Sequence, residues 1–378
     1  GSVIVVKEPG LKPTYRPDLV QLRRAADLLL QAKRPIILAG GGVIGSNASE
    51  ALTELAVHCQ IPVVSTLMGL GGFPGTHRLW YGMVGMHGTV AANKGLSEAD
   101  LLLAVGTRFA DRVTGKLSAF ASRSRIIHID IDPTSIRKNV NVDVPVVADC
   151  REAVLGLAEV LDARAGEKDW QQEHTQWIES LDRYEKDHPL CYVKNGEIKP
   201  QQVIETLYEL TGGENVIITT EVGQHQMWAA QFFKYATPRT FLSSGGLGTM
   251  GYGLPSAMGA QIAMPDKRVI GIAGDGSIQM NSQEFATIVQ NKLPLKIVIL
   301  NNCYLGMVRQ WQELFFKHNY MGPGMDGQPD FVRLAEAYGA EGYRITDPDD
   351  LVQTLQKALN SPHPALVDVR VAREGNVY

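Results

Sequence analysis

Arg268-Val-Ile-Gly-Ile-Ala-Gly-Asp-Gly-Ser277 is the most informative stretch of this 378-residue sequence. Its first six residues form a short, mostly apolar run that is typical of a buried parallel strand, and glycines follow directly. The next apolar run, Leu295–Leu300, ends in Asn301-Asn302. Ligands of open α/β sheets bind at the carboxyl ends of the strands. The two runs therefore predict an α/β domain that carries polar side chains at a binding edge.

Helical and strand-like segments alternate on both sides of this stretch. In the first part of the chain, helices are predicted at 19–30 and 51–59, with strands at 35–42, 61–65, 100–105 and 125–132. In the second part, helices are predicted at 200–210, 256–264, 282–291 and 331–338, with strands at 215–220, 268–273, 295–300 and 365–371. This alternation predicts an α/β protein with two doubly wound parallel-sheet domains.

A charged segment separates the two predicted domains. Residues 166–199 contain a dense run of acidic and basic side chains and are predicted to form a polar helical linker, solvated and without chemistry. The predicted boundaries are a first domain at 3–165, the linker at 166–199 and a second domain at 200–378.

Composition excludes several classes of protein. The chain is 44% hydrophobic and 20% charged, which is ordinary for a globular protein and excludes collagen-like, disordered and disulfide-scaffold chains. Its apolar runs are far shorter than the ~20 residues of a membrane span. A net charge of −4 gives no basic surface for nucleic acid. Four cysteines without a CxxC pair, and no recognisable signal peptide after the tag-like Gly1-Ser2, favour the cytoplasm, or the plastid stroma in a plant or alga.

The Gly-Asp-Gly turn and the Asn-Asn pair together indicate a metal and phosphate site. Asp275 and Asn302 supply the oxygen ligands that Mg²⁺ prefers, and glycines at 274 and 276 let backbone approach phosphate oxygens. Ser277 is predicted to begin a helix whose N-terminus favours anions. Alone, the turn would be interpreted as an ordinary strand–helix connection. The Asn-Asn pair, 27 positions later, favours the metal site.

A second glycine motif has a different interpretation that we consider weak. Gly246-Leu-Gly-Thr-Met-Gly251 fits the dinucleotide fingerprint GxGxxG. That fingerprint needs an acidic residue about 20 positions later, after a strand. The nearest candidate is Asp275, which already belongs to the predicted metal site, so a nicotinamide site is disfavoured.

Gly-Asp-Gly followed at this distance by Asn-Asn is the signature of thiamine diphosphate (ThDP) enzymes. From Pro17 to Tyr378 the sequence resembles one family among them, the catalytic subunit of acetohydroxyacid synthase (acetolactate synthase). The resemblance is carried by six stretches, which lie at Gly82–Gly88, Gly106–Gly115, His128–Pro133, Val222–Trp228, Gly245–Pro255 and Asn301–Gln312.

The resemblance implies roles for residues of the second domain. Asp275, Asn302 and the carbonyl of Tyr304 would bind Mg²⁺. Contacts to the diphosphate would come from Gln224, His225, Gly276, Ser277, Leu305 and Gly306, and contacts to the thiamine rings from Gly248, Met250 and Met307. Met250 would also hold the cofactor in its bent, reactive conformation. His225 considered alone would be interpreted as a buried core histidine, and only its neighbours favour the diphosphate role.

For the first domain the resemblance implies FAD, bound without a net redox step. The matching residues are Met86, His87, Gly88, Gly106, Arg108, Asp130, Asp132 and Asp149, and Arg108 would pair with the flavin phosphates. Glycines at 40–42 and 69–72 are weaker support, because they also occur in plain turns. Arg112 and Trp311 match residues that hold the second ketoacid, although without the resemblance a surface ion pair for Arg112 and a core contact for Trp311 would be favoured.

The implied reaction decarboxylates pyruvate and joins the two-carbon unit to pyruvate or 2-ketobutyrate, in the synthesis of branched-chain amino acids. A homodimer or tetramer is implied, and a regulatory subunit is possible. We find no match to the family's pyrimidine-binding domain, which carries a glutamate needed for cofactor activation, or to its closing C-terminal tail. We therefore expect impaired turnover. The alternatives are a fragment that binds cofactors without turnover, or a relative such as glyoxylate carboligase, pyruvate oxidase or oxalyl-CoA decarboxylase.

Overall fold

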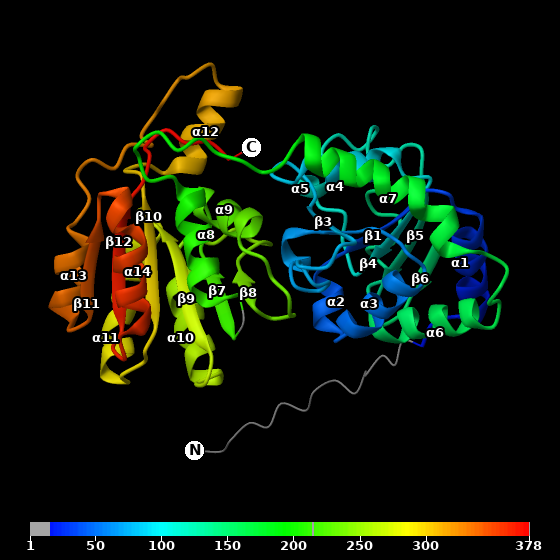
Figure 1. Cartoon of the computed structure of the whole chain (residues 1–378), viewed down its shortest axis with the longest axis horizontal. Helices are drawn as coiled ribbons and strands as arrows, with labels where there is room; N and C mark the ends of the chain where they lie inside the picture. The colour runs from blue at the N-terminus through cyan, green and yellow to red at the C-terminus, as the bar shows by residue number, and fades with distance from the viewer. Residues whose placement is uncertain (1–15, 214, 378) are drawn as a thin grey trace.

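The computed structural model describes residues 16–213 and 215–377. They form two α/β units that lie side by side, each built around a six-stranded parallel sheet (Figure 1). The predicted fold class is confirmed. Within the described residues, no helix has the length and apolar character needed to cross a membrane.

The first unit has the strand order β3-β2-β1-β4-β5-β6. These strands span Trp80–Met83, Val63–Ser65, Pro35–Ala39, Leu101–Val105, Arg125–Asp130 and Val144–Val147. Every residue of β1 and β4 is buried, because helices cover both faces of the sheet.

Side chains of β1 alternate between two hydrophobic cores, as the pleat of a strand requires. Ile37 and Ala39 pack with α1 (Leu19–Gln31), α3 (Ser49–His58) and α6 (Cys150–Asp162). Ile36 and Leu38 pack on the opposite face with α4 (Val90–Glu98) and α7 (Trp170–Asp187). The short helices α2 (Gly41–Gly45) and α5 (Asp111–Thr114) and the turn η1 (Leu67–Gly69) lie in the loops after β1, β4 and β2.

The predicted linker differs from the expectation of a fully solvated segment. One face of α7 is buried on the first sheet through His174, Trp177, Ile178 and Leu181. The indole Nε1–H of Trp177 donates to the carbonyl of Pro35 at 2.9 Å. The charged residues occupy the outer face of the helix, so their number concealed the apolar stripe. Within the predicted linker, residues 166–169 and 188–199 contain neither helix nor strand.

The second unit has the strand order β11-β12-β10-β9-β7-β8. Its strands span Glu341–Ile345, Ala365–Arg370, Lys296–Asn301, Arg268–Gly274, Val216–Thr220 and Phe241–Ser243. One face is covered by α8 (Pro200–Thr211), α9 (Gln224–Phe232) and α14 (Leu351–Asn360), and the other by α10 (Gly253–Ala263), α11 (Glu284–Gln290) and α13 (Phe331–Tyr338). Two 3₁₀ turns, η2 (Ile278–Met280) and η3 (Pro348–Asp350), complete the unit.

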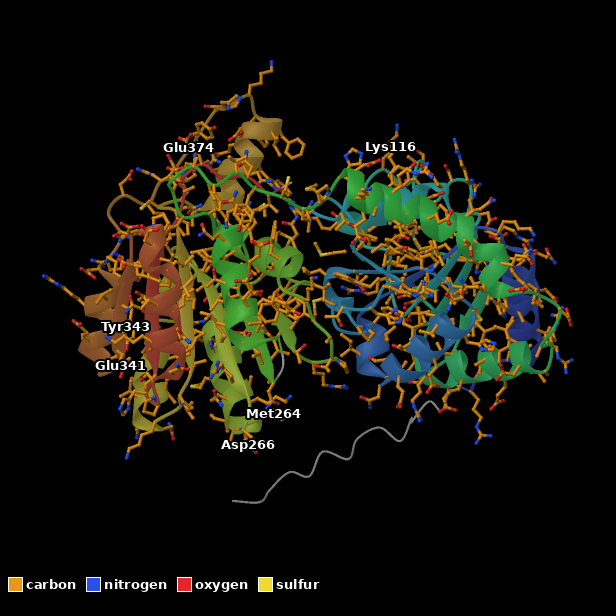
Figure 2. All side chains as sticks on the ribbon, in the orientation of Figure 1. Lys116, Met264, Asp266, Glu341, Tyr343 and Glu374 are labelled. Carbon is orange, nitrogen blue, oxygen red and sulfur yellow. The ribbon has the colours of Figure 1, made fainter. Side chains whose placement is uncertain are left out.

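Helix α12 and the last described segment lie at the same end of the second sheet. Helix α12 (Gly306–Phe315) follows β10 and stands beyond this end (Figure 1). Glu374, in the last described segment, lies at the same end, whereas Met264 and Asp266 lie at the opposite end (Figure 2). The backbone carbonyl of Glu374 accepts from Nη2 of Arg309 on α12 at 2.8 Å.

Asp18 caps the first helix, and removing its side chain should weaken the first unit slightly. Its Oδ1 accepts from the amides of Val20 at 2.7 Å and Gln21 at 3.3 Å. We expect Asp18→Ala to lower the free energy of unfolding by about 1 kcal/mol, because two amides of the first turn lose their acceptor. Urea denaturation measures the loss. Glu54→Ala, at an exposed position of α3, should change it by less than about 0.5 kcal/mol; equal losses would contradict the cap.

Candidate functional site

A cavity of about 840 Å³ lies between the two units and is lined by both. From the first unit come the turns after all six strands, together with α5. From the second come the start of α9, the loop after β8, and α12. Ten residues predicted for cofactor or substrate line it, namely Met86, His87, Gly106, Arg108, Arg112, Asp130, Asp149, Gly248, Met307 and Trp311. The structure thus brings residues of both domains to one cavity.

Glycines allow two turns of the first unit to pass in close contact at the cavity wall. A Cβ added to Gly40 would lie 2.1 Å from the carbonyl oxygen of Gly106, and one added to Gly42 would lie 2.6 Å from the Cα of Gly106. Gly106 itself has a φ of +61°, a conformation that side chains disfavour. These glycines therefore shape the wall by close backbone contact as well as by leaving space for a ligand.

Contacts from His128 and Asn139 to backbone carbonyls fix the loop that carries Arg108. A ring nitrogen of the buried His128 lies 2.8 Å from the carbonyl oxygen of Thr107. The amide of Asn139 donates to the carbonyl of Phe109 at 2.9 Å. Phe109 is buried with a φ of +51°, which is unusual for a residue with a side chain. This anchored bend places Arg108 at the cavity.

Arg112 and Trp311 meet across the boundary of the two units. The guanidinium carbon of Arg112, on α5, lies 4.5 Å from the ring centroid of Trp311, on α12. Among the described residues Arg112 forms no ion pair, and Trp311 lies in the cavity wall, so neither alternative to a site role describes them. A stacked guanidinium keeps its N–H groups free for a carboxylate.

The predicted metal ligands lie at the carboxyl ends of β9 and β10. Asp275 is almost fully buried, and its Oδ1 accepts from the amide of Gly276 at 3.1 Å. Burial raises the pKa of Asp275 to about 7, because desolvation disfavours the charged carboxylate more than the neighbouring backbone amides and Arg370 favour it. Oδ1 of Asn302 accepts from the amide of Tyr304 at 3.1 Å. The Nδ2 of Asn302 donates to Oε1 of Gln224 at 3.2 Å, which joins the predicted metal and diphosphate residues.

Two helix N-termini converge beside these ligands. Helix α9 begins at Gln224 and helix α12 at Gly306. The two are in close contact, since a Cβ on Gly306 would lie 2.0 Å from Oε1 of Gln224. The positive ends of two helices favour an anion such as a diphosphate. His225 is buried, and burial lowers its pKa to about 3, so its ring is neutral.

The donor set fits a hard cation that shares its coordination sphere with a ligand. It consists of a carboxylate, a side-chain amide and a backbone carbonyl, which are the oxygen donors that Mg²⁺ takes. Among residues 16–213 and 215–377 there is no cluster of three or more His, Cys, Asp or Glu that could hold a metal ion. A site with one carboxylate therefore leaves coordination positions open for water or for the oxygens of a bound phosphate.

Some predicted residues lie away from the cavity, and one prediction is wrong. Ser277 is followed by the single 3₁₀ turn η2, and α11 begins only at Glu284. The N-termini that can face an anion are thus those of α9 and α12. Outside the cavity wall also lie the predicted metal and diphosphate residues already described, namely Gln224, His225, Asp275, Asn302, Tyr304 and Gly306. The remaining predicted residues outside it are Gly88, Asp132, Met250, Gly276 and Leu305.

These outlying residues have local partners. The carboxylate of Asp132 accepts from the amide and hydroxyl of Thr134, which lowers its pKa. Gly88 packs against backbone, since a Cβ there would lie 2.3 Å from the carbonyl of Met83. Gly276 and Leu305 contact each other at the metal ligands. Met250 is half-buried in the exposed loop after β8. Their cofactor roles stay predictions.

Glu221 is a buried residue to which the sequence assigned no role. It is 1% exposed, and neither carboxylate oxygen has a hydrogen-bond partner of ordinary geometry within the described residues. Burial raises its pKa to about 7, against a smaller lowering by Ser277 and by the backbone of Gly251 and Leu254. Its position directly before Val222-Gly-Gln-His225 was the one available signal.

The buried carboxyl of Glu221 should make stability depend on pH. Its folded pKa of about 7 exceeds the ordinary 4.5, so its stabilising contribution is full below about pH 4.5 and is lost as the pH rises through 7. We expect Glu221→Gln, which stays neutral, to raise the free energy of unfolding by on the order of 2 kcal/mol near pH 8. Near pH 4.5 the gain should vanish. Urea unfolding at both pH values measures the gain in the free energy of unfolding, with Glu336→Gln as the exposed control. An equal gain at pH 4.5 and pH 8 would show that the titration of Glu221 is not its cause.

Comparison with known proteins agrees with this arrangement. Residues 22–157 match the central domain of thiamine pyrophosphate enzymes, and residues 221–369 match their C-terminal TPP binding domain. A probable acetolactate synthase large subunit from Methanococcus aeolicus is 46% identical over 97% of this chain and 63% of its own length. Acetolactate synthase from Mycobacterium leprae is 47% identical over 98% of this chain and 60% of its own. Acetolactate synthase isozyme 3 large subunit from Escherichia coli is 44% identical over 97% and 64%.

The chain thus belongs to the thiamine pyrophosphate enzymes, and it carries their central and C-terminal domains. The sequence prediction of this class is confirmed. Within the class, the chain is a homologue of the acetolactate synthase large subunit. It spans about 60% of the length of the curated relatives that it matches.

Proposed function

We propose that this chain provides the ThDP, Mg²⁺ and FAD sites of an acetolactate synthase. The enzyme would decarboxylate pyruvate and join the two-carbon unit to pyruvate or 2-ketobutyrate. The observation that carries the proposal is the convergence of Asp275, Asn302 and Gln224 at the edge of the second sheet, beside a cavity that both domains line. The similarity to large subunits over almost the whole chain supports it.

The chain's own residues have distinct tasks in this function. Asp275, Asn302 and the carbonyl of Tyr304 would hold Mg²⁺, and the N-termini of α9 and α12 would hold the diphosphate. When bound, ThDP supplies the electron sink that decarboxylation of a 2-ketoacid needs. His225 is neutral and buried, so it adds no charge to the diphosphate site.

The cavity supports the proposal of a flavin. Its volume of about 840 Å³ is near the upper end of the range typical of cofactor sites. Arg108 supplies a cation for the phosphates, and the glycines at 40, 42 and 106 leave their part of the wall as backbone without side chains. The Arg112–Trp311 pair would bind the carboxylate of the second ketoacid. A homodimer or tetramer and a regulatory subunit belong to the same proposal.

One experiment distinguishes this function from the main alternative. Because the chain spans about 60% of its relatives' length, it could bind cofactors without completing the reaction. The test is acetolactate formation from pyruvate with saturating ThDP, Mg²⁺ and FAD, together with calorimetry of ThDP binding. Turnover supports the synthase, and binding without turnover supports the alternative. Absence of Mg²⁺-dependent ThDP binding would overturn both.

Trp311 should influence the choice of the second ketoacid. Trp311→Leu removes the aromatic face on which Arg112 stacks, an interaction of about 1 kcal/mol, equivalent to about a fivefold change. We therefore expect the ratio of 2-ketobutyrate to pyruvate products to change by about that factor in an active, assembled form. The control is Phe316→Leu, at an exposed position just after α12. An unchanged ratio would remove Trp311 from the acceptor site.

A further inference from the structure

A chain of polar side chains continues beyond the predicted ligands at the metal site. Gln328 lies in the segment between α12 and α13 and is half-buried. The end of its side chain is 3.0 Å from Oδ2 of Asp275 on one side. On the other side it is 2.7 Å from Nη1 of Arg370 and 2.9 Å from Nδ2 of Asn301. No residue of this group except Asp275 was predicted as a ligand.

The chemistry of the neighbours fixes the orientation of the Gln328 amide. The guanidinium of Arg370 only donates hydrogen bonds, so the group that faces it must be an acceptor. The amide nitrogen must therefore face Asp275 and the amide oxygen must face Arg370. In this orientation Gln328 donates to Oδ2 of Asp275 and accepts from Arg370 and Asn301.

Ion pairs anchor the backbone on both sides of Gln328. Two residues before it, Asp326 pairs with Arg373 at 2.7 Å. Two residues after it, Asp330 pairs with Arg344 at 2.5 Å. These contacts join the segment to β11 through Arg344 and to the residues that follow β12 through Arg373.

A buried carboxylate contacts the same residues that surround the Gln328 amide. Asp368, on β12, is fully buried and accepts from Nδ2 of Asn301 at 2.8 Å. It also pairs with Arg370 at 3.2 Å and with Arg344 at 3.3 Å. The guanidinium of Arg370 thus stays beside the carbonyl of Gln328, where it strengthens the amide as a donor to Asp275.

We propose that Gln328 is a positioning residue that fixes the rotation of the Asp275 carboxylate for a divalent cation. The inference rests on the proposed function, because that function supplies the cation and the diphosphate. Hydrogen bonds to a metal ligand orient it, and removing one typically lowers metal affinity 10- to 100-fold. Gln328 would act in this way from a segment that supplies no metal ligand itself.

The test compares ThDP binding at limiting and at saturating Mg²⁺ by calorimetry. Gln328→Met keeps the length of the side chain and removes its donor. We expect its Kd for ThDP to rise about tenfold at limiting Mg²⁺ and to return close to the parent value at saturating Mg²⁺. Gln290→Met, at an exposed position of α11, should behave as the parent at both concentrations. Gln328→Ala gives the same comparison if the methionine variant does not fold.

Each contrary outcome has a separate meaning. A loss of ThDP affinity that saturating Mg²⁺ does not restore would mean that Gln328 only holds the segment in place, and would overturn the proposal. Unchanged affinity in both variants would also overturn it, while the proposed function stood. If the parent chain showed no Mg²⁺-dependent ThDP binding, the proposed function would fail together with this inference.

Discussion

Asp275→Ala should abolish the Mg²⁺-dependent binding of ThDP to this chain. Asp275 supplies the one carboxylate of the predicted ligand set, and Asn302 and a backbone carbonyl cannot replace its charge. Calorimetry of ThDP binding, with and without Mg²⁺, measures the effect. Asp266→Ala is the matched control, because this aspartate is exposed at the opposite end of the sheet (Figure 2).

The same substitution should affect stability in the opposite direction. Burial raises the pKa of Asp275 to about 7 from an ordinary 3.8, so its contribution to stability is lost as the pH rises through 7. Without metal, the alanine variant should therefore be at least as stable as the parent above about pH 7, as measured by its melting temperature. Lost ThDP binding in a well-folded variant would assign the effect to the ligand itself. Retained binding would show that the metal ligands lie elsewhere.

Gly40→Ala should destabilise the first unit strongly and disturb the cavity. The added Cβ would lie 2.1 Å from the carbonyl oxygen of Gly106, which is backbone and cannot rotate away. The turns after β1 and β4 would have to separate, although the amide of Gly40 donates to the carbonyl of Val105 at 2.9 Å. We expect a loss of about 3 kcal/mol in the free energy of unfolding, measured by urea denaturation.

Gly45→Ala provides the control for this prediction. Gly45 lines the same cavity from the end of α2, but a Cβ there meets no atom within 4 Å. Alanine in a helix should leave stability unchanged or raise it by up to about 1 kcal/mol. A similar loss in both variants would attribute the effect to a general sensitivity of α2. A loss confined to position 40 would confirm the close backbone contact.

Apolar runs made the centre of each sheet predictable. Strands β1, β4, β9 and β10 are buried on both faces, so their sequences are continuous runs of aliphatic residues. The edge strand β11 was missed, since it reads Glu341-Gly-Tyr-Arg-Ile345 and is buried mainly at its last residue. Strands β3 and β8 span only four and three residues, which is too short for a periodic pattern.

The candidate site was predictable where it depended on local sequence. Asp275 and Asn302 each directly follow the end of a strand, and parallel pairing of β9 with β10 places them at one edge. The contact of Arg112 with Trp311 is different, because it depends on how two separately folded units meet. Glu221 and Gln328 are single polar residues without a motif, so only the fold reveals what they contact.

The shared cavity has a thermodynamic consequence for the whole chain. A ligand that contacts both walls can bind only when the two units hold one relative orientation, and α7 moves with the first unit because it packs there. Residues 188–199 connect α7 to the second unit. There the carbonyl of Ile198 accepts a hydrogen bond from the amide of Ala372. Occupation of the cavity therefore links the folding equilibria of the two units, so that a ligand recognised by both stabilises each of them.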